Sequence, residues 1–176
     1  REPMRGLRRA DAFVLTRSDQ VSPGQSSELE GLLRRWNPQA PTYRAMHAHT
    51  GLRGANGGES IPVEELAQRR FLAFAGIGQP GSLDRQLTRF GKNYCGHCWF
   101  EDHHDYREGD LARMRQQARD AGADVLVVTE KDWAKIQRLD GARESRIPIW
   151  RLEVQIAMDA TAEAGLLALM KSRLTR

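Results

Sequence analysis

The fold of this chain is decided by the stretch Phe71-Leu72-Ala73-Phe74-Ala75, which runs into Gly76-Ile77-Gly78-Gln79-Pro80. Five consecutive apolar residues predict a strand that is buried on both faces. The turn after them leads into a helical pattern over about residues 82–90, and Gly91 is the expected C-terminal stop. A buried strand followed by a helix is the repeating unit of a parallel sheet, so this stretch predicts an α/β fold.

The same alternation continues toward the end of the chain. Further strands are predicted at residues 95–100, at 125–128 and from 147, each followed by a helical pattern. Thr129-Glu130-Lys131-Asp132 matches the capping box of a helix start, and Asp159 is expected to cap the final helix. This order predicts a mostly parallel sheet with crossover helices.

The residues before Phe71 follow a different pattern. One short buried strand is predicted at Ala12-Phe13-Val14-Leu15, and apolar spacing predicts an amphipathic helix over about residues 26–36. Four glycines between Gly51 and Ser60 indicate a mobile linker or a hairpin tip. We therefore expect three parts, namely the last strand and helix of an upstream P-loop-type α/β domain in residues 1–41, a linker or hairpin in residues 42–62, and a C-terminal α/β domain in residues 63–176.

Composition excludes several classes of protein. The chain has 176 residues, 40% of them hydrophobic, which is enough for a packed core. Two cysteines cannot cross-link a secreted scaffold, and no apolar run approaches the roughly 20 residues of a membrane span. The net charge of +4 fits a phosphate-bearing ligand, nucleic acid or an anionic membrane. No RNA-binding signature is present, so we expect no nucleic-acid partner.

Polar and glycine-rich motifs follow three of the predicted strands, where open α/β sheets bind ligands. Glu101-Asp102-His103-His104-Asp105-Tyr106 places histidines beside carboxylates, which suits a general base, a metal ligand or an orienting partner. A solvated loop with a helix cap at Asp105 is the alternative. Gly76-Ile77-Gly78 predicts a tight turn that approaches a ligand, and Lys131 or Asp132 would face the same edge.

Cys95-Gly96-His97-Cys98 admits three interpretations. A Cys-x-x-Cys pair suits thiol redox chemistry when it precedes a helix. A zinc site would add His103 and His104. The pair lies inside a predicted strand, so we favour ordinary strand cysteines.

Several of these segments, in order, resemble the tetraacyldisaccharide 4'-kinases of lipid A biosynthesis. The segments that carry the resemblance are Arg1-Glu2-Pro3, Arg9-Ala10-Asp11-Ala12, Val14-Leu15-Thr16-Arg17, Phe74-Ala75-Gly76-Ile77-Gly78-Gln79-Pro80, Phe100-Glu101-Asp102-His103-His104-Asp105-Tyr106 and Thr129-Glu130-Lys131-Asp132. The Cys95–Cys98 motif is not part of the family pattern. The resemblance covers roughly the second half of such an enzyme.

The resemblance implies a reaction. Enzymes of this family transfer the γ-phosphoryl group of ATP, with Mg²⁺, to the 4' hydroxyl of a tetraacyldisaccharide 1-phosphate. They have an N-terminal P-loop domain and a smaller C-terminal α/β domain, with the active site in the cleft between them. This chain has no G-x-x-x-x-G-K-[ST] sequence and begins at Arg1 rather than Met. We therefore expect it to begin inside a longer reading frame, to lack the P-loop domain and to be inactive alone.

The resemblance also implies roles for individual residues. His103 matches the histidine of the family's Asp-His motif, which supports a carboxylate base in the other domain, and Asp102 is its partner. Arg1 and Glu2 match a cleft-lining Arg-Glu pair of the first domain. We assign four further residues to the substrate or nucleotide cleft, namely Gly76, Gly78, His104 and Lys131.

The resemblance places the whole enzyme at the cytoplasmic face of the inner membrane of a Gram-negative-type cell, held there peripherally. Three other functions remain open from the residues themselves. One is a metal-dependent phosphoesterase that uses Asp102-His103-His104, another is a thiol redox module that uses Cys95 and Cys98, and the third is an interaction domain without a site.

Overall fold

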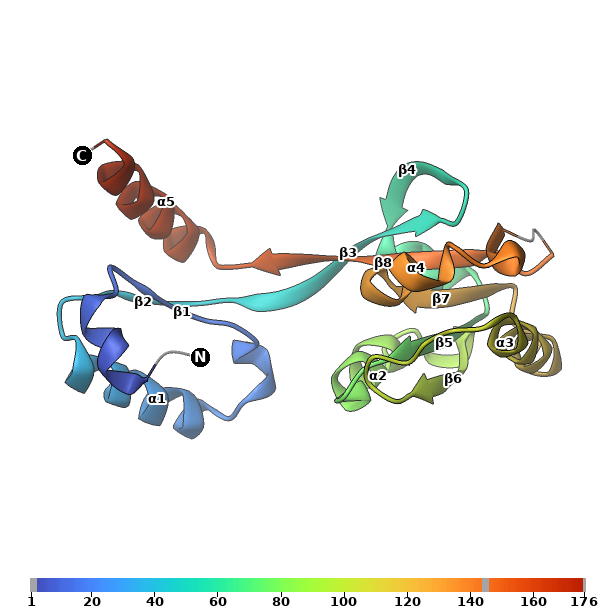
Figure 1. Ribbon diagram of the computed structural model, residues 1–176, viewed down its shortest axis with the longest axis horizontal. Coiled ribbons are helices and arrows are strands. Elements are labelled where there is room, and N and C mark those ends of the chain that lie inside the picture. Colours follow the sequence, from blue (N-terminus) through green and yellow to red (C-terminus); the bar gives the residue numbers. More distant parts are fainter. Residues whose placement is uncertain (1–2, 144–145, 176) are drawn as a thin grey trace. The chain divides into compact units, whose positions relative to one another are not determined.

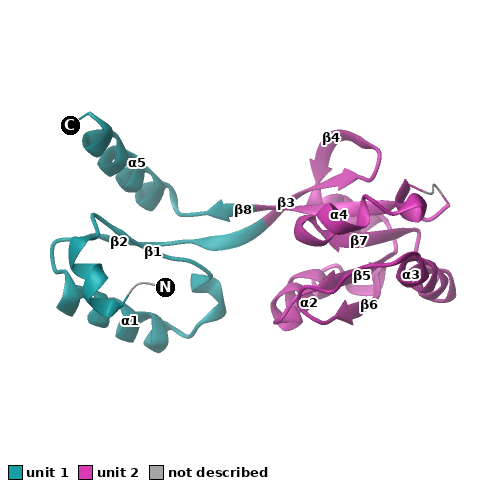
Figure 2. Cartoon of the chain, viewed as in Figure 1, with its two compact units in different colours: residues 1–48, 155–176 teal, residues 49–154 magenta. Residues whose placement is uncertain are grey.

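The computed structural model describes residues 3–143 and 146–175. They form two compact units (Figure 2): unit 1 comprises the described residues within 1–48 and 155–176, and unit 2 comprises those within 49–154. The chain passes between the units within two strands, β3 (Met46–Gly54) and β8 (Ile149–Ala157). The described residues of 155–176 thus belong to unit 1, whereas the sequence analysis predicted that residues 63–176 form one domain. The domain boundaries of the whole protein stay a prediction.

The larger sheet confirms the predicted α/β class with a mostly parallel sheet (Figure 1). Its strand order is β4-β3-β8-β7-β5-β6. Strand β5 pairs in parallel with β6 and β7, β7 pairs in parallel with β8, and β3 forms an antiparallel hairpin with β4. The strands not yet delimited are β4 (Gly57–Pro62), β5 (Phe71–Gly76), β6 (Tyr94–Phe100) and β7 (Val125–Thr129).

Crossover helices connect the parallel strands, as the sequence predicted. They are α2 (Pro80–Thr88) between β5 and β6, α3 (Glu108–Asp120) between β6 and β7, and α4 (Glu130–Ile136) between β7 and β8. Short 3-10 turns complete unit 2 at Val63–Gln68, Gly91–Asn93 and Asp140–Arg143. Thr129 caps α4 by accepting a hydrogen bond from the Asp132 amide, as its capping pattern predicted.

Strand β5 is buried on both faces because its side chains alternate between two cores. Leu72 and Phe74 pack into a cluster with Leu111, Met114 and Trp133, which come from α3 and α4. Residues Phe71, Ala73 and Ala75 pack into a second cluster with residues of α2 and of the 63–68 turn, among them Leu66, Leu83 and Leu87. Burial on both faces is the physical reason that this strand consists of apolar residues alone.

Unit 1 contains a small two-stranded sheet. Its strands β1 (Phe13–Leu15) and β2 (Thr42–Arg44) pair in parallel. Helix α1 (Pro23–Trp36) connects them and begins with a capping box between Ser22 and Gln25. Short 3-10 turns lie at Met4–Arg9 and Ser18–Gln20.

The final helix, α5 (Ala160–Leu174), is capped as predicted, since the Asp159 carboxylate accepts from the Ala162 amide at 2.8 Å. None of its described residues is buried, and Leu167, Met170 and Leu174 are exposed. Every helix among residues 3–143 and 146–175 is too short or too polar to cross a membrane.

Candidate functional site

The carboxyl ends of β5, β6 and β7 bring three motifs of unit 2 to one edge of the sheet. The parallel register pairs Gly76 with Phe100 and Phe74 with Val128, so the segments after these strands are neighbours. The Lys131 ammonium, from the first turn of α4, donates to Asp102 Oδ1 at 2.7 Å and approaches the Gly76 carbonyl at 3.5 Å. Three residues that the sequence analysis singled out, Gly76, Asp102 and Lys131, are thus in contact.

A buried carboxylate lies beneath this edge. Asp132 is fully buried, and its Oδ2 accepts from the Gly76 amide at 3.1 Å and from the Thr129 hydroxyl at 2.6 Å. The buried Tyr106 ring lies on the same side of β5, where it packs edge-on against Phe74. Burial, followed by the charge of the Asp132 carboxylate, raises the pKa of the Tyr106 hydroxyl. Asp132 therefore joins the end of β5 to the start of α4.

Gly76 is the point at which these segments converge. A Cβ at this position would lie 3.1 Å from the Glu101 carbonyl oxygen, 3.2 Å from Asp132 Oδ1 and 3.3 Å from the Tyr106 hydroxyl. The loops after β6 and β7 can approach β5 this closely because Gly76 has no side chain. At Gly78 a Cβ would meet only Asp102, at 3.6 Å, which is an ordinary packing distance.

Asp102 and His103 form the exposed part of the site. His103 has a left-handed backbone with φ of 64°, and its amide donates to Asp102 Oδ1 at 3.0 Å. Its imidazole Nε2 lies 3.7 Å from Asp102 Oδ2, and 79% of its side chain is exposed. The hydrogen bond from Lys131 is the main cause that holds the pKa of the Asp102 carboxyl below its ordinary value. Because most of the His103 side chain is exposed, its imidazole is accessible to a group from outside unit 2.

His104 is placed very differently from its neighbour. Its Nε2 lies 3.0 Å from Asp110 Oδ2, and its ring stacks on Phe100 with centroids 4.4 Å apart. Its carbonyl accepts from the Lys135 ammonium at 2.8 Å. These contacts fasten the 101–106 loop to α3 and α4. A role for His104 in the substrate cleft stays a prediction.

The two cysteines lie on β6 and are both free. Both are half-buried and pack against the core cluster that contains Phe74. Burial raises the pKa of the Cys98 thiol, which is opposite to the shift that activates a redox thiol. The strand placement that the sequence favoured is what the structure shows.

Two predicted site residues, Arg1 and Glu2, lie outside the described residues. Sequence reasoning did not find the contacts of Tyr106 and Asp132 with the end of β5. The Thr129-x-x-Asp132 pattern predicted a helix cap. It did not predict that the Asp132 carboxylate would accept a hydrogen bond from the Gly76 amide. Within the described part of the chain, no group of three or more His, Cys, Asp or Glu side chains is placed to hold a metal ion.

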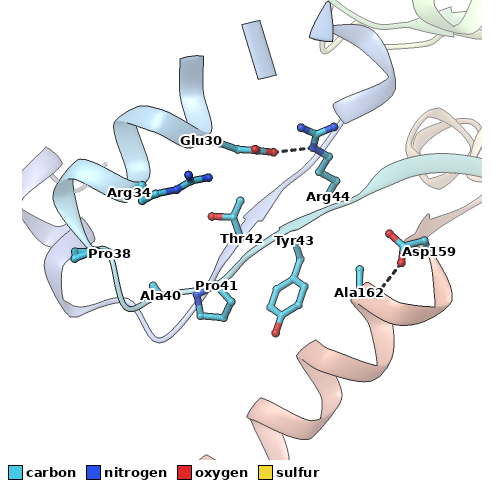
Figure 3. Close-up of a pocket in the computed structure, with 10 residues that line it drawn as sticks. All are labelled: Glu30, Arg34, Pro38, Ala40, Pro41, Thr42, Tyr43, Arg44, Asp159 and Ala162. Carbon is cyan, nitrogen blue, oxygen red and sulfur yellow. Dashed lines mark hydrogen bonds and ion pairs between the residues drawn. The ribbon is translucent and has the colours of Figure 1, made fainter. Parts of the chain in front are cut away.

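Unit 1 has a concavity of its own, with a volume of about 530 Å³ (Figure 3). Helix α1 contributes Glu30 and Arg34, and the Glu30 carboxylate accepts from Arg44 Nε of β2 at 2.7 Å. The start of α5 contributes Asp159 and Ala162. The remaining lining residues are Pro38, Ala40, Pro41, Thr42 and Tyr43. None of the strand-end residues described above lines this pocket.

Comparison with known proteins gives a consistent result. Residues 1–172 match the family described as tetraacyldisaccharide-1-P 4'-kinase. The chain is 30% identical over 174 residues to the tetraacyldisaccharide 4'-kinase of Halothermothrix orenii, covering 93% of this chain and 45% of that protein. It is 35% identical over 136 residues to the enzyme of Geobacter metallireducens, covering 77% of this chain and 37% of that protein.

A solved structure is also similar. The crystal structure of LpxK from Aquifex aeolicus in complex with ATP superimposes with a TM-score of 0.60 and 25% sequence identity, covering 98% of this chain and 45% of that chain. The chain thus spans less than half the length of each of these relatives.

Proposed function

Since the chain belongs to the tetraacyldisaccharide-1-P 4'-kinase family, we propose that it is the His103-bearing part of a lipid A kinase. The proposed reaction transfers the γ-phosphoryl group of ATP to the 4' hydroxyl of a tetraacyldisaccharide 1-phosphate. The hydroxyl oxygen forms a bond to the γ-phosphorus, the bond from that phosphorus to the β–γ bridging oxygen breaks, and ADP leaves. The hydroxyl proton passes to a carboxylate base.

The observation that carries this proposal is the exposed imidazole of His103 beside Asp102, at the carboxyl ends of the parallel strands, where open α/β sheets generally bind ligands. Phosphoryl transfer needs positioned charges and hydrogen bonds more than covalent chemistry. An imidazole held at a sheet edge can orient a carboxylate base and stabilise its protonated form. We assign this role to His103, with Asp102 as its partner.

The remaining cleft assignments belong to the same proposal. The backbone of Gly76 and Gly78 and the ammonium of Lys131 line the edge beside His103, and His104 fixes the loop behind it. Arg1 and Glu2 are proposed to line the opposite wall of the cleft. The acceptor and ATP are the small-molecule partners, and no nucleic acid takes part.

A P-loop domain that precedes these residues is proposed to hold the nucleotide. A two-stranded parallel sheet such as β1–β2 is too small to be stable by itself. Val14 of β1 and Leu29 of α1 are large apolar residues exposed at 40% and 43%. Further strands of a P-loop domain would extend this sheet and cover such residues.

The family implies Mg²⁺ together with ATP. The described residues offer no cluster of ligands for a metal ion, so the proposal gives these residues no metal-binding step. The ion, which would neutralise charge on the transferred phosphoryl group, would be bound by the nucleotide and the P-loop domain. Because the acceptor carries acyl chains and ATP is cytoplasmic, we place the reaction at the cytoplasmic face of the inner membrane, with peripheral attachment.

The test is the variant His103→Ala in the complete enzyme. We expect kcat to fall by roughly 10²-fold, the cost of misplacing a catalytic group by about 1 Å, because His103 orients the base rather than taking the proton, while the KM for ATP changes little. The matched control is His97→Ala, because His97 is a half-exposed histidine on β6 that pairs with Asp84 and Tyr94 rather than with the site. An unchanged turnover number in His103→Ala would refute the role of His103.

A further inference from the structure

His103 needs external support to keep its conformation. Its φ of 64° lies in the left-handed region, which residues other than glycine adopt at a cost. Because 79% of the His103 side chain is exposed, packing of the ring does little to fix its position. Two hydrogen bonds hold the backbone here: the His103 amide donates to Asp102 Oδ1 at 3.0 Å, and the His104 amide donates to the Glu101 carbonyl at 3.1 Å, which closes the turn.

The same carboxylate oxygen is held from the other side by Lys131. The ammonium donates to Asp102 Oδ1 at 2.7 Å and reaches toward the Gly76 carbonyl at 3.5 Å. Asp102 therefore lies between the Lys131 ammonium and the His103 amide. This arrangement couples the end of β5, the loop after β6 and the first turn of α4.

Lys131 lies in the first turn of α4, which is fixed to the sheet by its neighbours. Its neighbour Asp132 is fully buried and bonded to the Gly76 amide, and Thr129 caps the helix on which both residues lie. The ion pair is half-exposed, and exposed ion pairs contribute little to stability. Its effect is therefore on the geometry of the loop rather than on the stability of the fold.

We propose that Lys131 is a positioning residue, which acts through Asp102 to hold the His103 loop in the conformation that presents its imidazole to the phosphoryl-transfer site. This inference rests on the function proposed for His103. It differs from a role in which Lys131 binds nucleotide phosphate, because the ammonium would act through Asp102 Oδ1, to which it donates at 2.7 Å.

The kinetic test uses four variants of the complete enzyme and a fifth as the control. We expect Lys131→Met to lower kcat by roughly tenfold to a hundredfold, the usual cost of a small misplacement, with an unchanged KM for ATP. Lys131→Arg, which keeps the charge, restores most of the turnover. Asp102→Asn alone lowers kcat, and the double variant Lys131→Met/Asp102→Asn loses no more than the worse single variant, because the two residues act in series. The control is Lys92→Met, at an exposed lysine of unit 2 remote in sequence from the motif, which leaves kcat unchanged.

A second readout does not depend on activity. NMR relaxation of the His103 amide in the same preparations should show a lower order parameter in Lys131→Met than in the parent or in Lys92→Met, with unchanged melting temperature. Additive losses in the double variant would mean that Lys131 acts independently of Asp102, and a raised KM for ATP with unchanged kcat would mean that Lys131 contacts the nucleotide. Either result would overturn the proposal.

An ordered His103 amide in Lys131→Met would also overturn the positioning role of Lys131. The experiments distinguish failure of this role from failure of the function proposed for His103. Full turnover in His103→Ala refutes the function of the imidazole, while the relaxation data still decide whether Lys131 holds the loop.

Discussion

At the scale of single residues, Gly76 decides whether the strand ends can meet. Three oxygen atoms, from Glu101, Asp132 and Tyr106, surround the position that a Cβ would occupy. Two of them belong to buried side chains and the third to the backbone, so none can move aside at low cost.

We therefore expect Gly76→Ala to destabilise the protein by about 1–3 kcal/mol, the usual cost of overpacking. Denaturant unfolding measures this change. Gly109→Ala is the matched control, because a Cβ at Gly109 in α3 meets nothing within 4 Å and alanine favours the helix. Equal stability of the two variants would contradict this reading of Gly76.

The ionisation of Asp102 is a second prediction at the residue scale. The charged groups that face this carboxyl are Lys131 and His103, and the hydrogen bond from Lys131 is the largest cause of its lowered pKa. A lowered pKa in the folded state means that the contribution of the pair is present above the ordinary carboxyl pKa of 3.8 and is lost as the pH falls through the folded value.

Carbon-13 NMR titration of the aspartate carboxyls measures this midpoint. It should lie below 3.8 in the parent and rise in Lys131→Met. A midpoint that does not respond to the loss of Lys131 would show that the ion pair is absent in solution.

At the scale of elements, Thr129, the N-cap of helix α4, has two structural roles. Thr129 accepts from the Asp132 amide as an N-cap, and its hydroxyl donates to the Asp132 carboxylate at 2.6 Å. The cap thus starts the helix and also orients the buried carboxylate that binds the end of β5.

Thr129→Ala removes both hydrogen bonds, so we expect a loss of about 1–2 kcal/mol of stability. Thr129→Ser keeps the hydroxyl and should retain most of the stability of the parent. Hydrogen exchange of the α4 amides, followed together with thermal unfolding, separates local fraying from global destabilisation. Similar behaviour of the alanine and serine variants would argue against the hydroxyl as the cause.

At the scale of the whole molecule, we propose that a P-loop domain outside residues 1–176 binds the nucleotide. Residues 1–176 would contribute the sheet edge that carries His103. In the described part of unit 1, β1 and β2 form only a two-stranded sheet.

We expect residues 1–176 alone to transfer no phosphoryl group from ATP to the acylated disaccharide. The complete enzyme should be active, and the amides of β1 should exchange more slowly in it than in residues 1–176, because added strands would cover them. A radiolabelled-ATP assay and hydrogen exchange provide the two measurements. Full kinase turnover by residues 1–176 alone would refute the proposed division.

Features that depend on neighbouring residues could be predicted from the sequence alone. The apolar run of β5 predicted a doubly buried strand, and the local patterns at Thr129 and Asp159 predicted both helix caps, since a cap bonds to an amide three residues away. The alternation of such segments also predicted the mostly parallel sheet.

The side chains that meet at the edge of that sheet come from distant segments, so their contacts could not be predicted from local sequence patterns. Asp132 and Gly76 are 56 residues apart and Lys131 and Asp102 are 29 apart, yet both pairs are hydrogen-bonded. The left-handed backbone of His103 and the inward packing of His104 likewise distinguish two adjacent histidines that look equivalent in the sequence. Strand register and burial fix such contacts, and these are properties of the packed sheet rather than of any one segment.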